Sequence, residues 1–123
     1  MAKLTDREKT LAMIRALYTN YRLPEWAVLD EVRGGTGYGN VGHVRDANPL
    51  DLTERRLDFV AIQTWPSKGL RLVVFEIKAS RSDYQRELNS PQKRVLAESV
   101  SAQRYYVCPD GVIDPATLPE GWG

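Results

Sequence analysis

The first regular pattern in the chain is a set of apolar residues at helical spacing within residues 5–20. On a helix these residues share one face, as expected of a helix packed against a core: Leu11, Ile14, Leu17 and Tyr18. Thr5, followed three residues later by Glu8, gives the capping-box pattern of a helix start. We therefore predict an amphipathic helix over residues 5–20.

Short apolar runs predict strands further along the chain, at residues 26–33, 56–64, 70–78 and 103–108. The segment from Trp65 to Gly69 has turn residues, so the second and third strands are predicted to form a hairpin.

Helical patterns lie between the third and fourth strands. Residues 81–89 predict one helix, and residues 91–100 predict another. Pro91 suits the first turn of the second helix, with Ser90 as its cap.

The order helix, three strands, one or two helices and strand predicts an α/β fold. We expect a sandwich in which a central mixed four-stranded sheet is flanked by helices. The length of 123 residues predicts a single domain over 1–123. Gly-rich residues at about 34–53 are predicted to form a mobile loop, either closing over a nucleic-acid substrate or without such a role. Residues at about 109–123 are predicted to be irregular.

Composition narrows the classes of protein. One Cys and one His exclude an internal disulfide and a zinc finger. The formal net charge of +1 gives no general electrostatic argument for a nucleic-acid partner. No apolar run approaches the length of a membrane span, and the N-terminus lacks a signal core. We predict a cytoplasmic protein, bacterial or phage-encoded, without a membrane partner or an organic cofactor.

Ionisable residues interrupt two apolar strands where they are predicted to pair. Asp58 lies near the start of the second strand, and Glu76 and Lys78 lie at the end of the third. Because side chains alternate along a strand, Glu76 and Lys78 point to the same side. A hairpin would bring Asp58 beside them at one edge of the sheet.

Two converging carboxylates favour a divalent cation. Oxygen ligands suit Mg²⁺, which takes one or two protein carboxylates, waters and phosphate oxygens. The predicted ligands are Asp58, Glu76 and the backbone carbonyl of Ile77, and Lys78 would orient a water or stabilise charge on a phosphate. The constellation fits metal-assisted phosphodiester hydrolysis. A solvated Glu76–Lys78 ion pair without function is the alternative.

Asp58 followed by Glu76-Ile77-Lys78 resembles the (P)D…(D/E)xK signature of the PD-(D/E)XK nuclease superfamily. The flanking segments are similar to the MmcB-like DNA-repair nuclease branch and related phage proteins: Glu76 to Tyr84, Arg86 to Leu88, Pro91 to Arg94, Arg104 to Pro109 and Leu118 to Gly123. The opening helix and the Gly-rich loop also resemble archaeal Holliday-junction resolvases.

The resemblance implies a restriction-endonuclease-like core and a nuclease site at Asp58, Glu76 and Lys78 with Mg²⁺ or Mn²⁺. Related enzymes often add a glutamate from the first helix. Glu8 is the best match, and capping explains it equally well; Glu31 is a weaker candidate. Leu57 stands where the family often has proline, and relatives usually continue beyond Gly123 into a short last strand, so this chain looks one strand short. Protection of the sheet edge is therefore in question.

Basic residues follow the predicted site, and we predict that they contact the DNA backbone: Arg81, Arg86, Lys93 and Arg94. A solvated helix face is an equal alternative.

The main hypothesis is a metal-dependent DNA nuclease that acts in repair, recombination or phage DNA processing, with a homodimer as an open alternative to a monomer. The rival hypotheses are a non-cleaving nuclease-fold DNA-binding module and an ordinary α/β domain.

Overall fold

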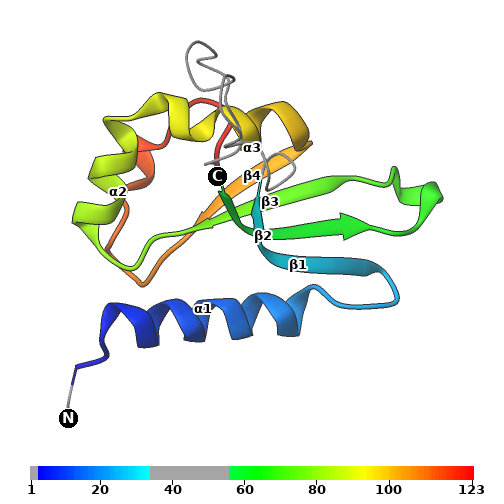
Figure 1. Ribbon diagram of the computed structural model, residues 1–123, viewed down its shortest axis with the longest axis horizontal. Coiled ribbons are helices and arrows are strands. Elements are labelled where there is room, and N and C mark those ends of the chain that lie inside the picture. The colour runs from blue at the N-terminus through cyan, green and yellow to red at the C-terminus, as the bar shows by residue number, and fades with distance from the viewer. Residues whose placement is uncertain (1–2, 34–55) are drawn as a thin grey trace, which may run out of the picture.

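The computed structural model describes residues 3–33 and 56–123 (Figure 1). Its helices and strands are α1 (Asp6–Asn20), β1 (Trp26–Arg33), β2 (Arg56–Gln63), β3 (Leu72–Ile77), α2 (Arg81–Leu88), α3 (Val95–Val100) and β4 (Gln103–Val107). The Gly-rich segment at about 34–53, predicted to be mobile, lies outside the described residues.

The strands form one mixed four-stranded sheet in the order β1-β2-β3-β4. β1 pairs antiparallel with β2, β2 pairs antiparallel with β3, and β3 pairs parallel with β4. The predicted hairpin is confirmed, with a register that runs from Ile62 opposite Leu72 to Phe59 opposite Phe75. β3 therefore lies inside the sheet, with a neighbour on each side.

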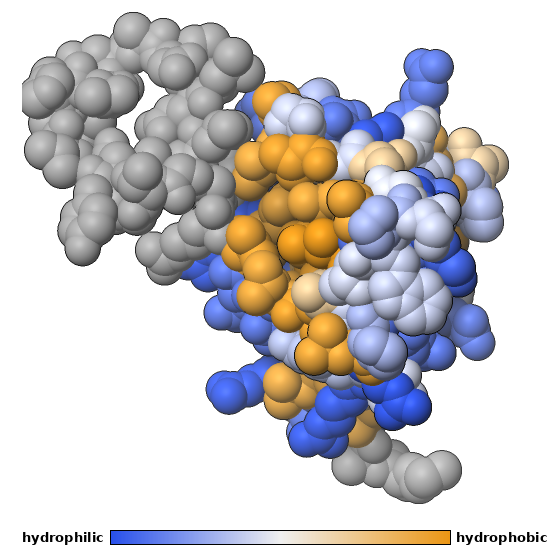
Figure 2. Space-filling model, turned by 90° about the vertical axis from the view of Figure 1, so that its right-hand side faces the viewer, coloured by the Kyte–Doolittle hydropathy of each residue, from blue (hydrophilic) through white to orange (hydrophobic). Residues whose placement is uncertain are grey.

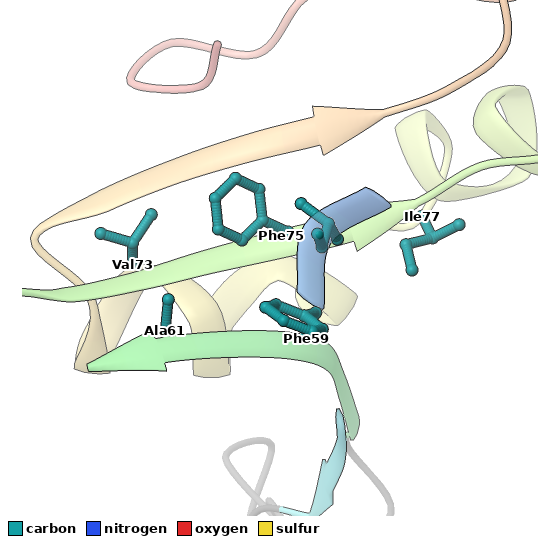
Figure 3. Close-up of a cluster of buried hydrophobic side chains, with 6 residues drawn as sticks. Phe59, Ala61, Val73, Phe75 and Ile77 are labelled. Atoms are coloured by element: carbon teal, nitrogen blue, oxygen red, sulfur yellow. The ribbon is translucent and has the colours of Figure 1, made fainter. Parts of the chain in front are cut away.

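Helices cover both faces of the sheet, which confirms the predicted α/β layering. In Figure 1, α1 lies below the sheet, and α2 and α3 lie above it. Leu17 of α1 packs on a cluster of side chains from the middle strands: Phe59, Ala61, Val73, Phe75 and Ile77 (Figure 3). On the other face, a second cluster joins the sheet to α3: Leu57, Val60, Val74, Leu96, Ala97 and Trp122.

The start of α1 matches the prediction, because the Thr5 hydroxyl accepts a hydrogen bond from the Glu8 amide at 3.1 Å. The predicted packing face is partly wrong. Leu17 is buried, Ile14 packs beside it, and Tyr18, although 39% exposed, meets the Phe59 ring at a centroid separation of 5.1 Å, but Leu11 is 43% exposed. Met13 and Tyr21 complete the contact instead, which rotates the buried stripe away from Leu11.

Apolar side chains also reach the surface, and Figure 2 shows them gathered in a band on one side of the molecule. The large hydrophobic side chains exposed among the described residues are Leu4, Leu11, Tyr18, Leu23, Leu29, Trp65, Leu70 and Val100. Much of an ordinary protein surface is apolar, so exposure by itself assigns no site to them.

The prediction of one α-helix over residues 91–100 is wrong in its first turn. Pro91–Arg94 forms a 3₁₀ turn, in which the Lys93 amide donates to the Ser90 carbonyl, and α3 begins only at Val95. Ser90 precedes the turn, but its side chain makes no capping hydrogen bond.

The C-terminal segment is mostly irregular, as predicted, with a 3₁₀ turn at Pro115–Thr117. It nevertheless pairs with the sheet edge. The Gly123 amide donates to the Arg104 carbonyl, and the Tyr106 amide donates to the Gly123 carbonyl, both at 2.9 Å. Two main-chain bonds therefore cover part of β4, the edge whose protection was in question.

None of the helices in the described part of the chain combines the length and the apolar character needed to cross a membrane.

Trp122 anchors the C-terminal segment. Its side chain is 7% exposed, and its ring stacks on Tyr106 with a centroid separation of 4.6 Å. We predict that Trp122→Ala lowers the free energy of unfolding by about 3–5 kcal/mol, measured by urea denaturation, because it removes a large buried ring. Trp65→Ala, at a ring 39% exposed, should cost no more than about 1 kcal/mol. Equal losses in the two variants would contradict this account.

Candidate functional site

The start of β2 and the end of β3 bring together the two carboxylates that the sequence predicts to converge, Asp58 and Glu76. The ladder of the two strands ends at Phe59 opposite Phe75, so Asp58 and Glu76 lie just beyond the last registered pair. Asp58 reaches across this end, where its Oδ2 accepts a hydrogen bond of 2.8 Å from the Ile77 amide. The charge of the same carboxyl acts on Glu76 and raises the pKa of the Glu76 carboxyl. The predicted convergence is therefore present.

Glu76 is held in its protonated form. Burial raises the pKa of the Glu76 carboxyl to about 9, and the negative charges of Asp58 and Glu87 and the hydrogen bond with Asp58 act in the same direction. The positive charge of Lys78 opposes them but does not reverse the shift. At neutral pH the Asp58–Glu76 pair thus holds a proton between two groups that would otherwise repel each other.

Lys78 pairs with a residue of α2. Its Nζ lies 2.8 Å from Oε1 of Glu87, and the two side chains are 14% and 6% exposed. Burial alone would lower the pKa of the Lys78 ammonium, but the hydrogen bond and charge of Glu87, with Glu76 and Asp58 behind it, raise the pKa above its ordinary value. Lys78 therefore carries its charge in a largely buried place.

Glu87 has a second partner in β4. The Tyr106 hydroxyl donates a hydrogen bond to Glu87 Oε2, so both carboxylate oxygens are engaged. Burial and the neighbouring carboxylate raise the pKa of the Tyr106 hydroxyl far above its ordinary range, which keeps it protonated as a donor. The Arg94 guanidinium donates to the main-chain carbonyl of Glu87 at 2.9 Å and fixes the end of α2.

The donor set fits a hard divalent cation that keeps most of its waters. Within residues 3–33 and 56–123, no group of three or more His, Cys, Asp and Glu side chains is placed to hold a metal ion. Mg²⁺ needs fewer, because it is commonly held by one or two carboxylates with water and phosphate oxygens. Asp58 and Glu76 supply two, and a cation could replace the proton that they share. The Ile77 amide contacts Asp58, while a role for the Ile77 carbonyl stays a prediction.

The other predicted carboxylate ligands do not join this pair in a three-residue group. Glu8 lies in the first turn of α1 with its side chain exposed, and its amide takes part in the cap with Thr5. The structure thus shows one half of the predicted capping box, the bond from the Glu8 amide to the Thr5 side chain. Glu31 lies in β1, with an exposed side chain and a left-handed φ of 48°.

The four predicted DNA-contact residues fall into two kinds. Arg81 donates to the Gly111 carbonyl at 3.0 Å, and Arg94 donates to Glu87, so both hold neighbouring segments in place. Arg86 is exposed and pairs with Asp83 at 2.9 Å, and Lys93 is exposed. Contact with nucleic acid stays a prediction for all four.

Sequence reasoning missed Glu87 and Tyr106 as parts of the site. A signal was present, because Tyr84 and Glu87 are three residues apart and share one helix face. Tyr84 is indeed buried, 5% exposed, with its ring edge against Tyr106. A carboxylate on a packed helix face needs a partner from the sheet.

A pocket of about 410 Å³ lies along α2. It is lined by Arg81, Tyr84, Gln85 and Leu88 of the helix together with residues 111–114 and Thr117. Asp58, Glu76 and Lys78 do not line it, so the carboxylate pair and the pocket are separate features.

No family model matches this chain, and no curated protein or solved structure matches it either.

The raised pKa of Glu76 predicts a pH dependence of stability in metal-free buffer. Between about pH 4.5 and 9 the folded protein holds a proton that the unfolded chain releases. The contribution of this proton to the free energy of unfolding is therefore complete below this pH window. It is lost as the pH rises through the window, by at most about 1.4 kcal/mol per pH unit. Glu76→Gln keeps an uncharged side chain at every pH, so its stability relative to wild type should increase from pH 5 to pH 9.

Urea denaturation in EDTA at pH 5, 7 and 9 measures this difference. Glu120→Gln removes an exposed carboxylate and controls for the change in net charge. A constant difference in stability between Glu76→Gln and wild type across the three pH values would contradict the shared proton.

Proposed function

We propose that this protein is a divalent-metal-dependent DNA nuclease with a restriction-endonuclease-like fold. The observation that carries the proposal is the half-buried Asp58–Glu76 carboxyl pair, next to Lys78, at the end of the β2–β3 hairpin. The resemblance of these three residues to the PD-(D/E)XK signature supports the same conclusion, as does the mixed sheet with helices on both faces.

The proposed roles follow from the chemistry of the side chains. Asp58 and Glu76 would hold Mg²⁺ or Mn²⁺, which when bound supplies positive charge next to a phosphodiester. Asp58 is oriented by the Ile77 amide, so one of its oxygens has a fixed direction. Lys78 offers N–H donors to a water or to a phosphate oxygen. Its raised pKa keeps it a donor rather than a base.

DNA is the proposed substrate because basic side chains follow the site in sequence. Lys93 and Arg86 are exposed, although Arg86 also pairs with Asp83, and backbone phosphates are the groups that such residues contact. We place the activity in DNA repair, recombination or phage DNA processing in the cytoplasm, on the resemblance to the MmcB-like branch.

A second candidate is a nuclease-fold module that binds DNA without cutting it. The favouring observation is that Lys78 is engaged with Glu87 and that the described residues offer two clustered carboxylates rather than three. The two candidates share a fold and differ in whether metal binding leads to hydrolysis.

We predict that the purified protein nicks or linearises supercoiled plasmid in Mg²⁺ or Mn²⁺ and is silent in EDTA. Asp58→Asn, Glu76→Gln and Lys78→Met should each lower the cleavage rate by about 100-fold or more, because each removes a group that meets developing charge. Lys9→Met, at a partly exposed α1 residue whose surface pair with Asp6 measures 3.8 Å, is the matched control and should keep the wild-type rate.

Full cleavage by the site variants would assign the activity elsewhere and overturn the proposal. The non-cleaving module would be favoured if wild type binds DNA without cutting it and if calorimetry shows no binding of Mg²⁺ or Mn²⁺ that depends on Asp58.

A further inference from the structure

Lys78 reaches the site from β3, but the contact that fixes its ammonium comes from α2. Glu87 Oε1 lies 2.8 Å from Lys78 Nζ, and Glu87 Oε2 accepts the Tyr106 hydroxyl. We propose that Glu87, oriented by Tyr106, is a positioning residue that holds the Lys78 ammonium beside the Asp58–Glu76 pair for the reaction. The inference rests on the proposed nuclease function and assigns to that site a partner that the nuclease signature does not contain.

The geometry favours a positioning role because a lysine side chain has many rotamers to lose. Fixing such a chain costs rotamer entropy, and an unrestrained Lys78 would occupy many positions relative to the phosphate. The short contact with Glu87 removes this freedom before substrate arrives. An ammonium has three N–H donors, and one bond to Glu87 leaves two for a water or a phosphate oxygen.

Glu87 is itself restrained at its side chain and at its main chain. Tyr106 occupies the second carboxylate oxygen, and Arg94 donates to the main-chain carbonyl of Glu87 at 2.9 Å. The Tyr106 ring lies between Trp122, stacked at 4.6 Å, and the edge of Tyr84 at 5.3 Å. The carboxylate thus has little room to move, and it passes its position on to Lys78.

Stability alone accounts poorly for this arrangement. Two charged side chains, 14% and 6% exposed, lose most of their hydration, and apolar replacements of similar size are often as stable as a buried ion pair. The Lys78 ammonium keeps its charge despite this loss of hydration and lies next to the carboxyl groups of Asp58 and Glu76, which fits a chemical use. The use is to keep positive charge at a fixed distance from the place where the substrate phosphate would lie.

The test compares single-turnover cleavage of a radiolabelled duplex in Mg²⁺ by four variants with that of wild type. Glu87→Gln keeps the size of the side chain and removes its charge, and we expect the cleavage rate to fall about 10–100-fold. The DNA concentration for half-maximal rate should stay within about twofold of wild type. Glu87→Ala should fall at least as far as Glu87→Gln, and Tyr106→Phe less far, because it removes only one of the two contacts of Glu87.

Tyr84→Phe is the matched control on the same helix. It deletes a hydroxyl that bonds to Thr117 and keeps the ring that packs on Tyr106, so the Lys78–Glu87 pair and its neighbours are unchanged. Its cleavage rate should stay near that of wild type. Nitrogen NMR of the Lys78 ammonium gives a readout independent of cleavage: the slowly exchanging Nζ signal of wild type should be present in Tyr84→Phe and lost in Glu87→Gln.

The outcomes separate the two proposals. If wild type does not cleave, the nuclease function fails, and the positioning role fails with it. If wild type cleaves and Glu87→Gln cleaves equally well, or if Tyr84→Phe loses as much rate as Glu87→Gln, the positioning role is overturned while the nuclease function stands. A selective loss of rate in Glu87→Gln with unchanged half-saturation, together with loss of its Nζ signal, supports the role.

Discussion

Burial of β3 is the constraint on which the rest of the structure depends. The strand has a neighbour on each side and helices over both faces, so its apolar residues form the centre of the domain. Val73, Val74 and Phe75 are almost fully buried. The two ionisable residues at its end, Glu76 and Lys78, are therefore partly withdrawn from water, and each must find a partner within the protein.

Glu76 and Lys78 meet this requirement in different ways. Glu76 gives up its charge, because burial and the nearby carboxylates of Asp58 and Glu87 raise its pKa, whereas Lys78 keeps its charge and pairs with Glu87. The result is a carboxyl pair in which Glu76 is uncharged, beside a fixed ammonium. In the proposed function, a divalent cation would replace the proton of this pair, and the ammonium would meet a phosphate oxygen. The proposed chemistry follows from how the fold balances buried charge.

The C-terminal half of the chain connects this site to the stability of the domain. Tyr106 links the two, because its hydroxyl donates a hydrogen bond to Glu87 while its ring stacks on Trp122. Arg94 fixes the end of α2, and Arg81 holds that helix to Gly111. Two of the basic residues that follow the site in sequence thus maintain its geometry, whereas Lys93 and Arg86 remain exposed at the surface.

The sequence by itself determined the strands, the β2–β3 hairpin and the meeting of Asp58 with Glu76, because alternation along a strand and the length of a turn are local properties. It also determined the Thr5 cap of α1. The tertiary structure alone decided that Leu11 would be exposed, that Ser90 would not cap α3, and that Glu87 and Tyr106 would complete the site. These outcomes depend on how separate elements pack against each other. The contacts of Glu87 with Lys78 and Tyr106 join residues from separate elements, and such contacts have no fixed spacing in the sequence. Only the folded arrangement therefore reveals them.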